Sequence, residues 1–289
     1  MNRRRFLSLT ACALAMPARA ATLSEWQGTG FGAALMLRLV GADPLHARRT
    51  FRRVEAEIEW IEAQFSLYRD SALTRLNRDG RLAWPSSDFH ALLDLCARVH
   101  GATSGAFDPT VQPLWLAEAR GGDLSVARDT IGWTRVKIAP EEVRLSHGQA
   151  LTFNGIAQGW AADRIAALLR ADGYGDALID MGEIQALGNG PNRSGWTAAI
   201  ASHAGKTLRE VRLTNRALAT SSPRGTLIGS GQSHILGPSG QPPLWSTISV
   251  SAPEAAVADA LSTAFCLMDR SAMEAALTEF PGARIEIVA

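Results

Sequence analysis

Apolar residues recur at helical spacing in the first half of the chain, after one apolar run that predicts a strand. The run covers residues 33–40, and Asp43-Pro44 then supplies a helix cap and a first-turn proline. The helix that follows should pack one face on the core, because apolar residues alternate at three- and four-residue spacing: Phe51, Val54, Ile58, Ile61 and Phe65. A second helix is expected to begin near residues 86–88 and to bury Phe89, Leu92, Cys96 and Val99. Just after residue 21, strict apolar–polar alternation is absent.

A turn rich in small residues precedes a third helix in the middle of the chain. The turn reads Asn154-Gly155-Ile156-Ala157-Gln158-Gly159-Trp160, and the helix places Ala161, Ile165, Leu168 and Leu169 on one face before it ends at Gly173. Such a turn lets backbone groups approach a ligand closely, and the helix N-terminus favours anionic groups. The alternative is a tight connection between a strand and a packed helix, and this segment alone leaves both open.

The second half of the chain reads as short strands followed by one more helix. Strands are predicted at residues 177–180, 184–187, 196–201, 208–213, 234–236 and 247–251, with a closing strand at 283–288. The helix is predicted at residues 255–268. Helices early and strands late indicate an α+β fold with a mostly antiparallel sheet and packed helices. No internal repeat or linker is evident, so a single compact domain is expected.

The first twenty residues are predicted to be a signal peptide, which leaves residues 21–289 as the folded domain. Three arginines precede an apolar run over residues 6–16 that is too short to span a bilayer, and Ala18-Arg19-Ala20 offers a cleavage site. The twin arginine before Phe6-Leu7 resembles the export signal of proteins that cross the membrane already folded, so a periplasmic location is expected. An ordinary secretory signal is the first alternative. Lipidation at Cys12 ranks below both, because the apolar run before it is very short.

Charge and cysteine content narrow the possible partners. Residues 1–20 hold four of the 29 basic residues and no acid, so removing them leaves 25 basic against 28 acidic residues, a formal charge of −3. That balance argues against nucleic acid or an anionic membrane surface as the main partner. Cys96 and Cys266 could pair in an oxidising compartment, but buried free thiols fit their apolar helical surroundings better. No Cys/His spacing typical of a metal site is present.

Two oxygen-bearing residues on the last predicted helix are candidates for metal binding. Asp259 and Thr263 are four residues apart, so they share one helix face a turn apart. A carboxylate and a hydroxyl are hard ligands that suit Mg²⁺. The alternative is an acid near a helix N-terminus and a threonine that bonds back to its own helix. Spacing alone favours that alternative.

Six segments, read in order, resemble the FAD:protein FMN transferase (ApbE) family. They are residues 65–77, 105–114, 154–164, 219–221, 234–240 and 258–264. The resemblance covers nearly all of residues 21–289. It implies an ApbE-like fold and a Mg²⁺-dependent enzyme that moves FMN from FAD onto a threonine or serine hydroxyl of a target redox flavoprotein, with release of AMP. It also implies that the acceptor is a flavoprotein subunit of a membrane-associated redox system.

The resemblance assigns roles to individual residues. Asp259 and Thr263 would be Mg²⁺ ligands, with a backbone carbonyl from the turn that contains Gly155 and Ala157. The positions expected to contact FAD are Phe31, Tyr68, Ala106, Phe107, Asp108, Thr152, Gln158 and Ile235. For Tyr68 a core position is the alternative. His234 opens a His-Ile-x-x-Pro motif, lines the site and is the candidate general base, against the commoner role of a hydrogen-bonded structural histidine.

The chemistry suits these residue types, although several positions depart from the family's pattern. Mg²⁺ would neutralise the charge of a pyrophosphate and steady the leaving AMP, so few catalytic side chains are needed. Phe31-Gly32-Ala33 stands where many members have Met-Gly-Thr, and Thr152 replaces a frequent aspartate. Gln158 replaces a frequent lysine or acid, and Gly237 a usual aspartate. Residues 180–183 are one glycine shorter than the usual turn, with Glu183 near its acidic position.

These departures keep other functions open. Loss of polar groups at Thr152, Gln158 and Gly237 would fit a non-catalytic flavin-binding or assembly protein of a periplasmic redox system. If water replaced the acceptor hydroxyl, the site would be an FAD pyrophosphatase that yields FMN and AMP. Unrelated enzyme classes find no support, because no dinucleotide-binding glycine motif after a strand, phosphate loop, nucleophile elbow or zinc-helix motif occurs.

Overall fold

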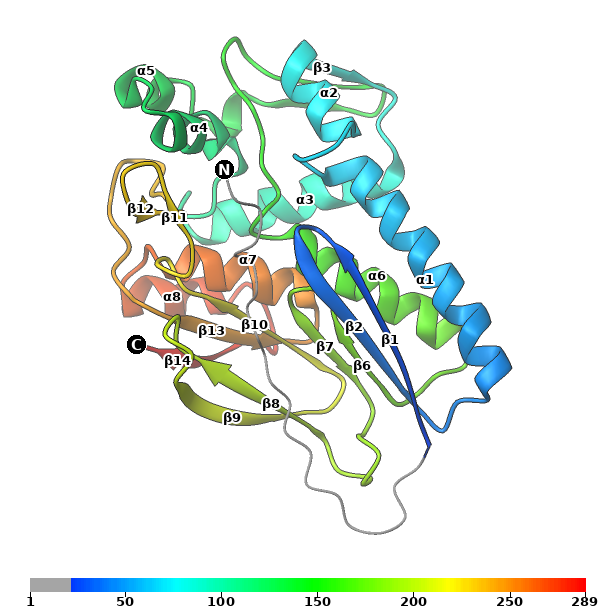
Figure 1. Ribbon diagram of the computed structural model, residues 1–289. Helices are drawn as coiled ribbons and strands as arrows, with labels where there is room; N and C mark the ends of the chain where they lie inside the picture. The colour runs from blue at the N-terminus through cyan, green and yellow to red at the C-terminus, as the bar shows by residue number, and fades with distance from the viewer. Residues whose placement is uncertain (1–21) are drawn as a thin grey trace.

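A seven-stranded antiparallel sheet runs through the computed structural model, which describes residues 22–289 (Figure 1). Its strands, in spatial order, are β1 (Leu23–Gly30), β2 (Ala33–Val40), β6 (Ala177–Asp180), β7 (Ile184–Leu187), β10 (Arg216–Ser221), β13 (Ile248–Ala252) and β14 (Arg284–Val288). Every neighbouring pair is antiparallel. The expected α+β class with an antiparallel sheet is therefore confirmed.

Each face of this sheet is covered by a different layer. Helices α1 (Pro44–Phe65), α6 (Ala157–Ala171) and α7 (Ala255–Phe265) pack on one face, and the hairpin of β8 (Trp196–Ala201) and β9 (Thr207–Leu213) packs on the other (Figure 1). Side chains alternate between the faces along a strand, so Leu178 packs toward the hairpin whereas Ile179 joins the helical core. The expected single compact domain is confirmed as these stacked layers.

Local capping explains where the two long early helices begin. Asp43 accepts hydrogen bonds from the backbone N–H groups of Leu45 (3.1 Å) and His46 (2.9 Å), and Pro44 opens α1, as the sequence predicted. Helix α3 (Ser87–Ala102) begins after Ser86, whose hydroxyl accepts from Phe89 N–H. Of the apolar residues predicted for the two buried faces, only Phe51 is not fully buried.

Helix α7 lies in the interior and is the element on which the site depends. Every residue of α7 except Thr263 is buried. Its first turn is capped by Asp163 of α6, which accepts from Ala255 N–H (2.8 Å) and Ala256 N–H (2.9 Å). The helices can approach this closely only because residue 159 is glycine, since a Cβ there would lie 2.7 Å from the Cα atom of Ala256 and closer still to the Ala255 carbonyl oxygen.

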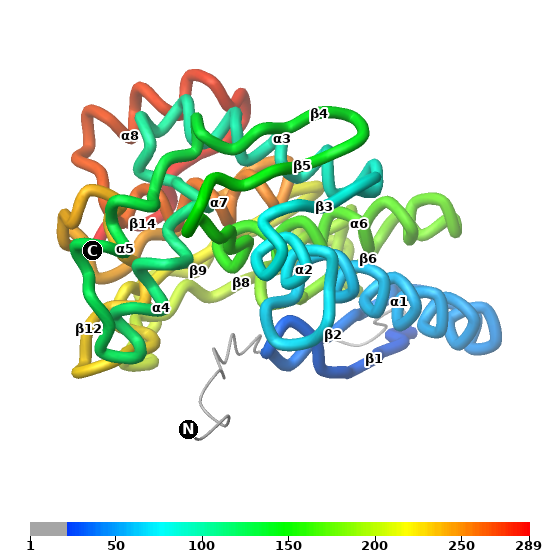
Figure 2. Tube along the Cα trace, turned by 90° about the horizontal axis from the view of Figure 1, so that it is seen from above, coloured from blue at the N-terminus to red at the C-terminus, as the bar shows by residue number. Residues whose placement is uncertain are grey.

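The remaining elements are short. They are α2 (Ala72–Asp79), β3 (Arg81–Ala83), α4 (Gln112–Arg120), α5 (Leu124–Asp129), β4 (Lys137–Ala139), β5 (Glu142–Arg144), β11 (Leu227–Ile228), β12 (Gln232–Ser233) and α8 (Arg270–Leu277), with short 3₁₀ turns at Pro109–Val111 and Trp133–Arg135. Figure 2 shows α1 and α6 side by side at one end of the molecule, and α4, α5 and β12 at the other.

One predicted strand is wrong. Residues 234–236 form a bend that follows the short β11–β12 hairpin. The cause is local side-chain bonding, because the Ser233 hydroxyl accepts from Ile235 N–H (3.0 Å) and also bonds Ile235 O (2.9 Å). Those bonds occupy the backbone groups that a strand would offer to its neighbour.

Both cysteines of the described chain are buried and free, as expected. Burial raises the pKa of the Cys266 thiol to about 12 and that of Cys96 further, so neither thiol ionises at neutral pH. Across residues 22–289 there is no helix with both the length and the apolar character needed to cross a membrane. The predicted signal peptide, residues 1–20, lies outside the described residues.

Candidate active site

The two segments expected to hold a metal meet in the folded chain. Asp259 accepts a hydrogen bond from the backbone N–H of Gly159 (3.0 Å), a residue 100 positions earlier. One turn further along α7, Thr263 lies directly against Gly155, where a Cβ would be only 3.0 Å from its Oγ1 atom. A side chain at residue 155 would therefore press on Thr263, and glycine leaves the two segments room to lie this close together.

The Asp259 carboxyl lies in an unusually negative interior. It is 3% exposed, and its pKa is raised to about 7, chiefly by desolvation and also by the nearby charge of Asp163, against the opposing Gly159 hydrogen bond. Burial together with the charges of Asp259 and Asp180 raises the pKa of Glu183 well above its usual range. Among residues 22–289, no arginine or lysine forms an ion pair with Asp259 or Glu183. A bound cation would supply the missing positive charge.

The donors gathered here fit a hard cation. Asp259 offers a carboxylate and Thr263 a hydroxyl, and the turn at Gly155–Ala157 adds backbone carbonyls. Nothing in residues 22–289 gathers three or more His, Cys, Asp or Glu side chains into a metal site. Among the donors named above, a metal at this place would be held by the Asp259 carboxylate together with neutral oxygens, a donor set that suits Mg²⁺.

Thr263 does not bond back to its own helix. Its Oγ1 atom lies 3.3 Å from the Ser221 hydroxyl of β10, and Ser221 lies 2.8 Å from the Ser262 hydroxyl. The carbonyl of Asp259, which a threonine at this position could bond, accepts instead from Ser262 (3.0 Å). The alternative explanation of Thr263 from spacing alone is thus wrong, and the cap of α7 is Asp163 rather than Asp259.

A cluster of aromatic side chains packs against Phe153, the residue that precedes the turn. Phe153, immediately before Asn154, packs edge-on against Phe65 of α1 (5.6 Å between ring centroids) and against Phe89 of α3 (5.7 Å). Its carbonyl accepts from Ala157 N–H at 2.8 Å, which closes the turn onto the start of α6. Two early helices thus hold the backbone that faces Thr263.

His234 is held by the bend that follows β12. Its Nδ1 atom lies 3.1 Å from the carbonyl oxygens of both Pro223 and Thr226. Carbonyls only accept, so Nδ1 carries the hydrogen and the Nε2 lone pair remains available. Burial lowers the pKa of His234, which keeps the ring neutral near pH 7. Pro223 follows Ser221 by two residues, so the histidine is tied to the end of β10 beside Thr263.

The Ala106-Phe107-Asp108 triplet is largely engaged in its own loop. The Phe107 side chain is 6% exposed, and its N–H and carbonyl bond Thr103 Oγ1 (3.1 Å) and His100 Nδ1 (2.9 Å). Asp108 caps the 3₁₀ turn through Thr110 N–H (2.8 Å) and Thr110 Oγ1 (2.6 Å). Ala106 is the member of the triplet that lines a cavity.

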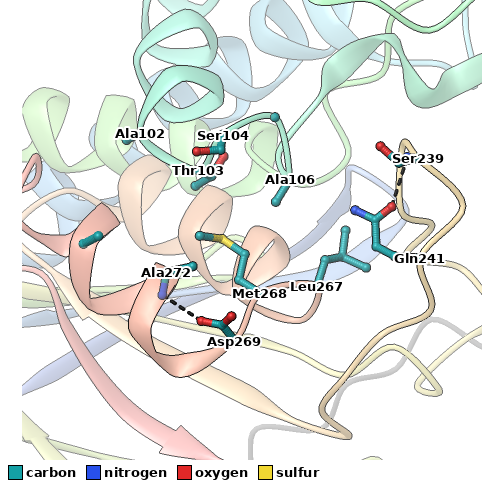
Figure 3. Close-up of a pocket in the computed structure, with 12 residues that line it drawn as sticks. Ala102, Thr103, Ser104, Ala106, Ser239, Gln241, Leu267, Met268, Asp269 and Ala272 are labelled. Carbon is teal, nitrogen blue, oxygen red and sulfur yellow. Dashed lines mark hydrogen bonds between the residues drawn. The ribbon is translucent and has the colours of Figure 1, made fainter.

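That cavity has a volume of about 320 Å³, and part of its lining, Leu267 to Asp269, follows the end of α7 (Figure 3). It lies between the loop after α3, the 239–241 segment and the corner that joins α7 to α8, and its lining includes Ala106, Gln241, Leu267 and Ala275. The side-chain oxygen Oε1 of Gln241 accepts from Ser239 N–H (3.0 Å), and Figure 3 shows the side-chain nitrogen of Gln241 pointing toward Ala106 and Leu267. The cavity therefore presents the Gln241 amide as a hydrogen-bond donor beside the apolar side chains of Leu267 and Met268.

Phe31 and Tyr68 lie on two turns that Glu62 of α1 joins. Phe31 has a left-handed backbone (φ 52°) in the β1–β2 turn, and its N–H donates to Glu62 (2.9 Å). The other Glu62 oxygen accepts from Arg69 (3.1 Å), the neighbour of Tyr68. Tyr68 is 70% exposed, which excludes the alternative of a core tyrosine.

Three other residues were predicted to contact FAD, and each lies in a different environment. The Thr152 hydroxyl accepts from Asn154 N–H (3.2 Å), and the Gln158 amide lies on Gly182, where a Cβ would overlap it. Ile235 is buried. Asp163, Ser221 and Ser262 also belong to this site but could not be recognised as such from local patterns, although all three lie within segments that carried the family resemblance.

Comparison with known proteins places these features in context. The ApbE family pattern matches residues 31–286. The chain is 28% identical over 291 residues to the FAD:protein FMN transferase of Klebsiella pneumoniae (strain 342), covering 88% of this chain and 80% of that protein. It is 24% identical over 271 residues to the protein of the same name from Escherichia coli (strain K12), covering 84% and 77%.

Solved structures show the same fold. The flavin transferase ApbE from Vibrio cholerae superposes with a TM-score of 0.80 at 22% identity, covering 92% of this chain and 93% of that one. The apo form of the Pseudomonas stutzeri flavinyl transferase ApbE gives a TM-score of 0.78 at 24% identity, covering 91% and 90%. At such identities the likeness establishes a shared fold.

Proposed function

This chain belongs to the ApbE family, and on that premise we propose that it is a Mg²⁺-dependent FAD:protein FMN transferase. It would move FMN from FAD onto a threonine or serine hydroxyl of a target redox flavoprotein and release AMP. The observation that carries the proposal is that Asp259 bonds Gly159 and Thr263 lies against Gly155, at a place where no arginine or lysine of residues 22–289 pairs with Asp259.

Some residues of the site would bind the metal, and others would contact FAD. Asp259, Thr263 and the backbone carbonyls of Gly155 and Ala157 would hold Mg²⁺, which supplies charge neutralisation at the pyrophosphate when bound. Ala106 would contact FAD from the cavity of Figure 3, which is large enough for part of that molecule. Exposed Tyr68 would lie against the flavin ring.

The remaining predicted contacts would complete the FAD site. Phe31 would form the wall on the flavin side, and Ile235 would pack behind the segment that carries His234. Phe107 and Asp108 would act through the rigid loop that presents Ala106. Thr152 and Gln158 are neutral, so their contacts to FAD would be hydrogen bonds and not ion pairs.

The transfer itself requires one bond to form and one to break. The acceptor oxygen would bond to the phosphorus on the FMN side of the pyrophosphate, and the bond from that phosphorus to the bridging oxygen would break. AMP would leave with that electron pair, and the hydroxyl proton would pass to Nε2 of His234. The imidazole suits this role, because its Nδ1 hydrogen is committed to two carbonyls and its pKa is lowered.

The N-terminal sequence supports a proposal for where the protein acts. We place the protein in the periplasm after twin-arginine export, where the acceptor would be a flavoprotein subunit of a membrane-associated redox system. The formal charge of −3 after removal of residues 1–20 supports a protein acceptor over nucleic acid. Cell fractionation and N-terminal sequencing of the processed protein test this placement, and an unprocessed cytoplasmic product would contradict it.

A single assay tests the activity. The purified protein is incubated with FAD, Mg²⁺ and candidate acceptor domains, and covalent flavin is measured by in-gel fluorescence and intact mass. An acceptor that gains FMN only when Mg²⁺ is present is the expected result. Asp259→Asn is the matched variant, and its rate should fall by at least about 100-fold.

The same assay separates the alternatives. Free FMN and AMP without an adduct, across all acceptors, would indicate an FAD pyrophosphatase. FAD that stays bound and intact under every condition would indicate a flavin-binding or assembly protein. Full activity of Asp259→Asn would overturn the metal assignment.

A further inference from the structure

A chain of three hydroxyl groups begins at the candidate metal ligand Thr263 and ends at the backbone carbonyl of Asp259. Thr263 Oγ1 lies 3.3 Å from Ser221 Oγ, Ser221 Oγ lies 2.8 Å from Ser262 Oγ, and Ser262 Oγ lies 3.0 Å from the carbonyl oxygen of Asp259. Ser221 comes from the end of β10, whereas the other residues belong to α7. The chain of hydrogen bonds therefore crosses between the sheet and the helix.

The direction of these hydrogen bonds is fixed by the carbonyl at one end. A carbonyl has no hydrogen, so Ser262 must donate to Asp259 O. A hydroxyl has a single hydrogen, so Ser262 can only accept from Ser221. Ser221 has then used its own hydrogen, and Thr263 must donate to Ser221.

This direction determines what Thr263 offers to the open side of the site. Its hydrogen points inward to Ser221, so both oxygen lone pairs remain for the side that faces Gly155. A neutral hydroxyl binds a cation only through a lone pair, and a hydrogen turned toward the metal would oppose binding. Thr263 is also the one residue of helix α7 that is not buried.

We propose that Ser221 and Ser262 are positioning residues that orient the Thr263 hydroxyl for metal binding. The inference rests on the proposed metal site and adds to it a hydrogen-bonded support that runs back to the Asp259 backbone. Partners of this kind commonly change metal affinity by about 10- to 100-fold when removed. Neither serine touches the substrate or the metal in this proposal.

The test measures metal binding without turnover. Binding of Mn²⁺ to the purified protein, with no FAD present, is followed by electron paramagnetic resonance. Ser221→Ala should weaken Mn²⁺ binding by about tenfold or more, since the Thr263 hydroxyl loses the acceptor that fixes the direction of its hydrogen. Ser221→Thr keeps the hydroxyl and should restore binding.

Ser222→Ala is the matched control. The Ser222 hydroxyl bonds Thr247 Oγ1 (3.2 Å) and lies outside the three-hydroxyl chain, so this variant should bind Mn²⁺ as the wild type does. In the transfer assay, Ser221→Ala should raise the Mg²⁺ concentration needed for half-maximal rate and leave the rate at saturating Mg²⁺ nearly unchanged. A general structural defect would lower that saturating rate as well.

Each outcome separates this inference from the proposed function. Failure of the wild type to bind Mn²⁺ would overturn the metal site itself. Wild-type binding by Ser221→Ala would overturn the positioning role and leave the metal site intact, as would equal weakening in Ser222→Ala. Should Ser221→Ala fail to fold, Ser262→Ala removes the donor to Asp259 O instead, and unchanged Mn²⁺ binding in that variant would equally overturn the role.

Discussion

His234 shows how a single side chain is held in a segment without regular secondary structure. Two backbone carbonyls, from Pro223 and Thr226, share its Nδ1 hydrogen, and burial disfavours the imidazolium form. A histidine fixed in this tautomer offers one unprotonated nitrogen at neutral pH. The structural role and the catalytic role are therefore compatible, because they use different ring nitrogens.

We expect His234→Asn to lower kcat by about 100-fold or more while FAD affinity changes little. The asparagine amide nitrogen stands where Nδ1 does and can still donate to the two carbonyls, but it cannot take up the acceptor proton. Because burial lowers the pKa of His234, the wild-type imidazole stays neutral down to about pH 6.5, the usual pKa of a histidine. The acid limb of the kcat profile should therefore lie below about pH 6.5. Steady-state kinetics across pH for both proteins, with FAD binding by fluorescence, provide the measurement. An unchanged kcat in the variant would show that another group accepts the proton.

At this scale the sequence identified residues better than it identified their partners. Asp259, Thr263 and the turn at Gly155 could be predicted from helix spacing and small-residue content together with the family resemblance. The bonds of Ser221 could not, because they depend on a strand end that meets α7 only after the sheet has formed. The raised pKa of Asp259 is likewise a property of burial, which no local pattern encodes.

The contact of α6 with α7 is the element-level feature that brings the turn to the metal ligands. Gly159 sits at the crossing, where it donates its N–H to Asp259 and leaves room for the Ala255 carbonyl. The same crossing brings Asp163 to the first turn of α7. A change in the spacing of the two helices would therefore alter the site as well as the core.

Gly159→Ala should destabilise the protein by about 3 kcal/mol or more, since backbone atoms on both sides of the new Cβ cannot move independently. Alanine favours a helix over glycine by only about 1 kcal/mol, so the steric cost dominates. Urea unfolding monitored by circular dichroism gives the difference. Gly175→Ala is the control, because a Cβ there meets nothing within 4 Å, and its stability should match the wild type. Equal stability of both variants would mean that the helices separate without cost.

Helix α8 offers a way to test the cavity of Figure 3 without touching the core. Ala275 is exposed at the rim and lines the cavity, so Ala275→Phe should narrow it and weaken FAD binding by about tenfold. The neighbouring residue Glu274 is exposed but does not line the cavity, so Glu274→Phe serves as the control. Fluorescence titration with FAD compares the two. Wild-type affinity in Ala275→Phe would place FAD elsewhere.

The long elements were predictable and several short ones were not. Capping by Asp43 and Ser86 and the helical spacing of apolar residues located α1 and α3. Strand β1 was missed because it is an edge strand without strict alternation, and its pairing with β2 defines it. Strand β10 was missed because its small buried residues Ala217, Leu218 and Ala219 carry little strand preference. Both depend on tertiary pairing and not on local sequence.

On the scale of the whole molecule, one domain concentrates buried acids around the interior helix α7. The pKa of Asp163 is raised to about 6, mainly by desolvation, and those of Asp180, Glu183 and Asp259 are raised as well. Each of these carboxyls binds its proton more tightly in the folded than in the unfolded state. Folding stability from this cluster is therefore full below about pH 4 and is lost as pH rises toward about 7.

Metal binding should reverse that loss, because Mg²⁺ requires the ionised form of Asp259. We expect Mg²⁺ to raise the Tm more at about pH 8 than at about pH 5, where Asp259 holds its proton in the folded state. Asp259→Asn should abolish this gain. In the presence of a chelator, the Tm of Asp259→Asn should exceed that of the wild type at about pH 8, because a neutral amide replaces a buried charge. This difference in Tm should be smaller at about pH 5. Thermal melting of both proteins at the two pH values, with Mg²⁺ or with chelator, measures all of these effects. A Mg²⁺-dependent gain that is equal at both pH values, or that persists in Asp259→Asn, would show that the cation binds away from this carboxylate.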